Sequence, residues 1–153
     1  KDLFTSVTSQ FSGAIQKRMK NFSNHEKDQF GTSNFEFSVR AALVKDFTKY
    51  SLGAHTDSIG KFVTYLFYIP KDNSLENVGT ALYKPIKEID EHGHFDDENT
   101  RINFEKIKTC PFIPNCALIF PRTSKSYHGV EEVNINKQER NLFLLNYYLV
   151  KKK

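Results

Sequence analysis

Residues 50–70 read YSLGAHTDSIGKFVTYLFYIP, and the expected fold is built outward from this stretch. His55 and Asp57 stand two positions apart, just before a turn at residues 58–60. Residues 61–69 then alternate in the manner of a strand. One predicted face carries Phe62, Thr64, Leu66 and Tyr68, and the other carries Val63, Tyr65, Phe67 and Ile69. The stretch therefore predicts a strand edge that presents a histidine and a carboxylate.

A histidine and a carboxylate two residues apart can turn toward one metal ion, because such positions share a strand face. His128 stands at the start of another expected strand and fits as a third ligand. Two histidines and one carboxylate bind one face of an octahedral Fe(II) ion and leave the opposite positions open. The residues thus predict an iron site made by His55, Asp57 and His128.

A second His-x-Asp pattern, His94 and Asp96, competes with the first, and His92 stands beside it. It falls in residues 85–100 (PIKEIDEHGHFDDENT), an acidic excursion without a strong strand on either side. A metal site there would lack a rigid frame. We expect this segment to be a polar loop, or a rim over the first site.

Length and composition indicate one mainly β domain over residues 1–153. Hydrophobic residues make up 39% of the 153 residues and charged residues 26%, enough to bury a core. Aromatic residues reach 14% and favour strands. Strands are expected at residues 35–47, 50–54, 61–69, 79–83, 101–108, 117–120, 127–133 and 141–150.

The leading segment, residues 6–22, has apolar side chains near a 3.6-residue period and predicts one helix on the outside of a sheet, capped by Thr5 or Ser6. Residues 41–44 (AALV) lose the alternation, which predicts that both faces are covered there. A short helix over residues 39–45 is the alternative. About eight strands within residues 35–150 and one leading helix match a double-stranded β-helix, the cupin-like jelly roll.

Charge and cysteine content limit the partners and the compartment. The net charge is +4, but the lysines are scattered, so no strong nucleic-acid signal is present. The longest apolar run, residues 62–70, is too short to cross a bilayer. Cys110 and Cys116 have no second pair for zinc, and no signal peptide points to an oxidising compartment. We expect reduced cysteines and a cytoplasmic protein, and the start at Lys1 leaves room for a removed N-terminal segment.

Four motifs occur in the order found in one enzyme superfamily: LGAHTDSIGKFVTYLFYIP, GTALY, PNCALIFPRTSKSYHGV and ERNLFLLNYYL. Over about residues 35–150 the chain resembles the Fe(II)/2-oxoglutarate-dependent oxygenases, in their prolyl-hydroxylase-like branch, and more narrowly small bacterial and phage members. The resemblance implies a hydroxylase that uses Fe(II), 2-oxoglutarate and O2 and releases succinate and CO2.

The same resemblance implies roles for individual residues. His55, Asp57 and His128 would hold the iron, and Arg140 would bind the far carboxylate of 2-oxoglutarate. Arg140 lies twelve residues after His128, a longer spacing than usual in this branch, and Lys137 is the fallback. Tyr68 would place its hydroxyl on the same carboxylate, and Thr64 would share its face of the cofactor pocket.

Two alternatives stay open on the sequence. One is a peptidyl-prolyl hydroxylase, and the other is a jelly-roll module that binds a metal or small acid without turnover. Ser124 and Ser126 lack a base-nucleophile pattern, which disfavours a hydrolase. The substrate, whether small molecule or peptide, and the oligomeric state are not determined by these residues.

Overall fold

Two four-stranded sheets make up the body of the protein in a computed structural model that describes residues 2–20, 27, 35–89, 93–134 and 139–152. All strand pairs are antiparallel, and the orders are β1-β8-β3-β6 and β2-β7-β4-β5. The strands are β1 (Phe35–Asp46), β2 (Leu52–His55), β3 (Lys61–Tyr68), β4 (Ala81–Pro85), β5 (Phe104–Thr109), β6 (Ala117–Pro121), β7 (His128–Val130) and β8 (Arg140–Lys151). The prediction of a mainly β protein is confirmed.

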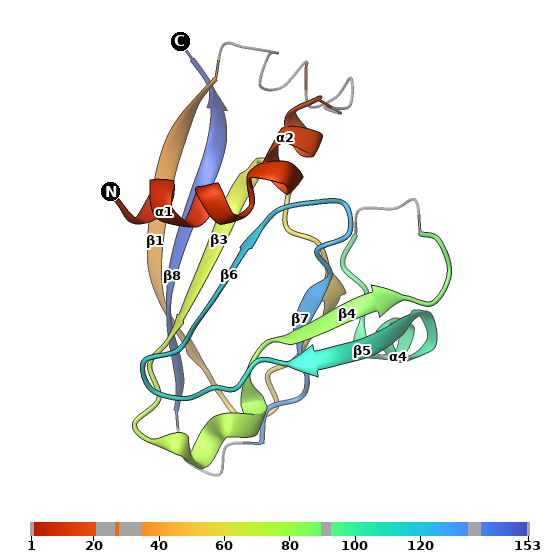
Figure 1. The fold of residues 1–153 in the computed structure, drawn as a ribbon. Helices are drawn as coiled ribbons and strands as arrows, with labels where there is room; N and C mark the ends of the chain where they lie inside the picture. Colours follow the sequence, from red (N-terminus) through yellow and green to blue (C-terminus); the bar gives the residue numbers. More distant parts are fainter. Residues whose placement is uncertain (1, 21–26, 28–34, 90–92, 135–138, 153) are drawn as a thin grey trace.

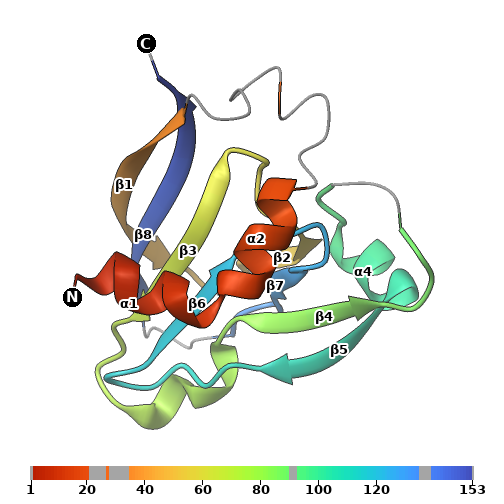
Figure 2. The same ribbon diagram turned by 45° about the horizontal axis from the view of Figure 1, so that its top comes forward.

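The sheet β1-β8-β3-β6 is covered on its outer face by the N-terminal helices, as Figures 1 and 2 show. Odd-numbered residues of β3 and β8, such as Tyr65 and Leu149, pack under these helices. Even-numbered residues, such as Thr64 and Asn146, line a cavity to which both sheets contribute. The alternation expected for residues 61–69 therefore separates a hydrophobic layer from a site-facing layer.

The leading segment forms two helices, α1 (Leu3–Gln10) and α2 (Ser12–Lys20), so the prediction of one helix over residues 6–22 is wrong in its bounds and continuity. The first helix begins earlier because Asp2, rather than Thr5 or Ser6, caps it by accepting a hydrogen bond from Thr5 N at 2.9 Å. The helix ends at Gln10 because its C-cap residue, Phe11, leaves the helical region at φ −106° and ψ 16°. The prediction that the segment packs outside a sheet is confirmed.

Phe62 departs from the face predicted for it. It packs in the helix-covered layer, with its ring 4.9 Å from that of Phe37 and 6.4 Å from that of Phe4. The pairing of β3 with β8 shifts register between Lys61 and Val63, so the chain has an irregularity of the β-bulge type there. A bulge re-aims a side chain without changing the alternation beyond it.

β1 runs unbroken through Asp46, so the alternative of a short helix over residues 39–45 is wrong. The expectation that residues 41–44 are covered on both faces is also wrong, because Leu43 is 80% exposed. Val44, in contrast, contacts the cavity between the sheets. Loss of alternation in the sequence therefore does not correspond to burial here.

The acidic excursion attaches to β2 just before His55. Phe95 N donates to Ala54 O at 3.0 Å, and the Thr100 hydroxyl accepts from Ala54 N at 2.7 Å. Residues 97–103 form the helix α4 (Asp97–Asn103), capped by Asp96. Gly53 permits this approach, because a Cβ there would lie 1.8 Å from Phe95 O.

Gly53→Ala is expected to destabilise the protein, because the added methyl group meets backbone that cannot move without breaking the hydrogen bond from Phe95 to Ala54. Overpacking of this kind costs about 1–3 kcal/mol. Gly13→Ala is the matched control: nothing lies within 4 Å of its Cβ position in α2, so a gain of about 0.5–1 kcal/mol is expected. Urea denaturation of both variants measures the difference, and equal midpoints would contradict the docking of residues 95–96.

Cys110 and Cys116 are free thiols, as expected. Within the described part of the chain, every helix is too short or too polar to cross a membrane.

Candidate metal centre

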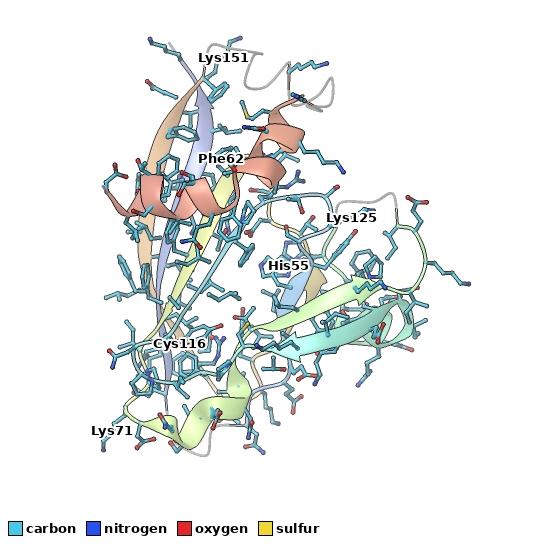
Figure 3. All side chains as sticks on the ribbon, viewed as in Figure 1. His55, Phe62, Lys71, Cys116, Lys125 and Lys151 are labelled. Carbon is cyan, nitrogen blue, oxygen red and sulfur yellow. The ribbon has the colours of Figure 1, made fainter. Side chains whose placement is uncertain are left out.

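Three ligand side chains meet where β2 and β7 pair. His55 ends β2, His128 begins β7, and the two residues are direct partners in the antiparallel register. Asp57 follows two residues after His55, and all three side chains are buried. Their ligand atoms lie within 4.8 Å of one another, so residues far apart in the chain form a candidate His-Asp-His metal site. Figure 3 shows His55 in the space between the two sheets.

Both histidines are oriented by backbone carbonyls. His55 Nδ1 lies 3.0 Å from Gly53 O, and His128 Nδ1 lies 3.0 Å from Ser126 O. A carbonyl oxygen only accepts, so each Nδ1 carries the proton and donates it. The Nε2 atom of each neutral ring is then left with a lone pair for a metal ion.

Asp57 is held through both of its carboxylate oxygens. Lys61 Nζ donates to Oδ1 and the Thr64 hydroxyl donates to Oδ2, each at 2.6 Å. Arg122 Nε donates to the backbone carbonyl of Asp57 at 3.1 Å. Each carboxylate oxygen keeps a second lone pair, so these bonds orient the group without exhausting it.

Burial and neighbouring charges together set the charge of the three ligands. It lowers the pKa of His55 from 6.5 to about 4, and the neighbouring His128 acts in the same direction. Burial also lowers the pKa of His128, against the attraction of Asp57. Burial alone would raise the pKa of Asp57, but Lys61, His128 and the Thr64 hydroxyl outweigh it and hold this pKa below 3.8. Neutral imidazoles and an ionised carboxylate are the forms that bind metals.

The metal-free protein is expected to lose stability as the pH falls from about 6.5 toward 4. In that range the unfolded chain protonates His55 and His128, while the folded state resists protonation because both pKa values are lowered. The unfolding free energy then falls by at most about 1.4 kcal/mol per pH unit for each histidine. Asp57, whose pKa is lowered in the folded state, adds a further loss as the pH falls through the usual carboxyl pKa of 3.8. Urea denaturation at several pH values, with a chelator present, measures how the unfolding free energy depends on pH. If a His55→Gln/His128→Gln variant showed the same dependence on pH as the wild type, the prediction would be contradicted.

A cavity of about 140 Å³ extends from the three ligands to Arg140. Its remaining walls are mainly apolar side chains of both sheets, including Leu66, Val130 and Leu142. Pockets for drug-sized ligands measure roughly 300–1,000 Å³, so this cavity suits a small molecule beside a metal ion.

The structure brings Arg140 and Thr64 to this cavity, but it places Tyr68 behind the wall. Tyr68 is buried against Phe112, with ring centroids 4.9 Å apart, and its hydroxyl accepts from Thr80 N at 3.3 Å. Thr80 lines the cavity, and Tyr68 is absent from the lining among the described residues. Thr64 bonds to Asp57, so it orients a metal ligand. A direct contact of either residue with a co-substrate stays a prediction.

His94, from the competing His-x-Asp pattern, lies beside the first site. Its ring stacks on that of His55 at 4.5 Å with an interplanar angle of 9°. His94 is exposed and is not one of the three converging ligands found among the described residues. His92 and Lys137 lie outside the described residues. The position of His94 agrees with the expectation of a rim over the site.

The cavity lining also contains polar residues that the sequence analysis did not assign to the site, namely Asp46, Lys61, Thr80 and Asn146. Lys61 could have been found from its position four residues after Asp57 at the start of a strand. Asp46 had no such signal, because its place depends on the pairing of β1 with β8.

Comparison of the sequence with protein-family models and with curated proteins finds no match. Among solved structures, the chain is similar to a prolyl-4-hydroxylase from Pseudomonas putida, at 10% sequence identity and a TM-score of 0.41. The match covers 94% of this chain and 80% of that one. A likeness of this degree establishes neither a family nor a function, so the candidate site depends on its own geometry: two histidines and an aspartate that converge at one end of a small cavity.

Proposed function

We propose that the protein is a non-haem Fe(II)- and 2-oxoglutarate-dependent dioxygenase that hydroxylates a substrate and releases succinate and CO2. One observation carries the proposal. His55, Asp57 and His128 converge at one end of a small cavity, and Arg140 contributes to the same cavity a buried donor that has no hydrogen-bond partner among the described residues.

The donor set fits Fe(II). Two neutral imidazoles with free Nε2 atoms and one carboxylate are the ligands of the facial triad of non-haem iron oxygenases. The hydrogen bonds from Lys61 and Thr64 fix the carboxylate, and the backbone carbonyls fix both rings. Such outer contacts are what hold metal ligands in a productive orientation.

The cavity fits a short acid better than a peptide. Its volume of about 140 Å³ accommodates few non-hydrogen atoms, so a peptide or larger substrate would approach from outside, past His94. Bound Fe(II) would provide the centre at which O2 is reduced by four electrons, two from the decarboxylation of 2-oxoglutarate and two from the hydroxylated substrate, so that one oxygen atom ends in succinate and the other in the product. The chain contributes a carboxylate-binding guanidinium and apolar walls that exclude water.

We also propose that the fold is a jelly roll. The orders β1-β8-β3-β6 and β2-β7-β4-β5 mean that the first and last strands pair, as do the second and seventh. Folding one long antiparallel ribbon into two Greek keys produces this connectivity. The ligands of β2 and β7 then face the inner side of the sandwich.

The decisive experiment is turnover after anaerobic reconstitution with Fe(II). The protein with 2-oxoglutarate and O2 is expected to release succinate and CO2 in equal amounts, coupled to O2 uptake, and Asp57→Ala is expected to release none. A protein that binds Fe(II) and 2-oxoglutarate but consumes neither co-substrate would instead be a non-catalytic binding module. Analysis of the products formed from candidate prolyl peptides and from small molecules then tests the peptidyl-prolyl hydroxylase alternative.

A further inference from the structure

Asp46 and Arg140 form a buried ion pair at the end of the cavity away from the histidines. They are direct partners in the register of β1 and β8, and both line the cavity. Arg140 is 1% exposed and Asp46 5% exposed. The adjacent pair, Lys45 and Glu139, is exposed to solvent and lies outside the cavity lining.

The guanidinium of Arg140 is only partly satisfied by the protein. Nη1 donates to Asp46 Oδ2, and Nε donates to Val78 O at 2.6 Å. Nη2 is buried and has no partner among the described residues. Asp46 therefore occupies one arm of the fork that would otherwise bind a carboxylate through two parallel hydrogen bonds. The other arm is left for a ligand.

The formal charges around the cavity cancel in pairs. Lys61 neutralises Asp57, and Asp46 neutralises Arg140, while His55 and His128 are neutral. A bound divalent cation would then give the site a net charge of +2, and the charge of −2 on one dicarboxylate would balance it. Without Asp46, the same site would carry one positive charge more.

We infer that Asp46 is a specificity-determining residue, because it cancels the charge of Arg140. The cavity then selects a 2-oxo dicarboxylate through a single hydrogen bond from Arg140 and not through an excess of positive charge. The inference rests on the proposed function, since it concerns the acid bound beside the metal. It predicts a moderate preference for a second carboxylate in the wild type and a larger one once Asp46 is neutral.

The test compares 2-oxoglutarate with 2-oxopentanoate, which has the same chain length and 2-oxo acid group but no second carboxylate. Anaerobic calorimetry on the Fe(II)-loaded protein gives the ratio of their dissociation constants. The wild type is expected to prefer 2-oxoglutarate by about 10–100-fold, the effect of one charge-assisted hydrogen bond. Asp46→Asn keeps an acceptor for Nη1 and is expected to raise this ratio by about tenfold or more, because a like charge beside the ligand is lost.

Glu139→Gln is the matched control, because it removes a carboxylate next to Arg140 in sequence but outside the cavity. Its ratio is expected to equal that of the wild type. An unchanged or lower ratio in Asp46→Asn would overturn the inference while leaving 2-oxo acid binding intact. If that variant does not fold, the wild-type ratio is the test. A preference for 2-oxoglutarate above about 1,000-fold would be larger than the effect of one hydrogen bond, and it would refute the inference that Asp46 cancels the charge of Arg140. Failure of both acids to bind the wild type would overturn the proposed function itself.

Discussion

Asp57→Ala is expected to lower the Fe(II) affinity of the protein by more than about 100-fold, since loss of an outer hydrogen-bond partner alone costs about 10–100-fold in metal sites. The carboxylate is the sole anionic ligand in the converging group of described residues, and it is ionised because Lys61 and Thr64 hold its pKa low. His55→Ala is expected to have a similar effect. Anaerobic calorimetry with Fe(II) measures both variants.

The matched control is His94→Ala. It removes an imidazole that stacks on His55 at 4.5 Å but does not belong to the ligand group, so Fe(II) affinity is expected to stay largely intact. Asp57→Asn, which keeps the volume and loses the charge, separates metal binding from packing. Loss of iron in His94→Ala together with retention in His55→Ala would reverse the assignment of the site.

Arg140→Ala is expected to weaken 2-oxoglutarate binding by about 1.5–3 kcal/mol, the range for hydrogen bonds to charged groups. Binding of 2-oxopentanoate, which has no second carboxylate, is expected to change little. The variant also leaves Asp46 buried without its partner, so a loss of about 3–5 kcal/mol in the free energy of unfolding is expected in addition.

The stability cost is separated from the binding cost by a double variant. Asp46→Asn/Arg140→Gln removes both charges of the buried pair and should fold better than Arg140→Ala, yet still lack the donor for the far carboxylate. Lys45→Ala, which removes an exposed cation beside the pair, is the control for net charge. An unchanged 2-oxoglutarate affinity in the double variant would reject Arg140 as the anchor.

The local pattern was sufficient for several features of the molecule. Alternation identified β3 and its inward face from Thr64 onward, and the polar and glycine-containing turns separated most of the strands. The spacing of His55 and Asp57, with His128 at a later strand start, identified the group that converges in the structure. These features depend on residues that are near one another in the sequence or that share one face of a strand. Both relations can be recognised from the spacing of residues in the sequence.

Other features depended on register and bulges, which a pattern does not record. The irregularity between Lys61 and Val63 sends Phe62 to the helix side, and a cap at Asp2 with a break at Phe11 replaces one long helix by two. The direct facing of Asp46 and Arg140 follows from the pairing of strands almost a hundred residues apart.

The residue types of this chain thus determined a β protein with a two-histidine, one-carboxylate group, because side-chain chemistry and period-two alternation are written in consecutive positions. Only the tertiary structure decided that Lys61 and Thr64 hold Asp57, that His94 covers His55, and that Asp46 occupies half of the Arg140 fork. These contacts are set by which strands pair and in which register, and that is the outcome of long-range packing of the whole chain.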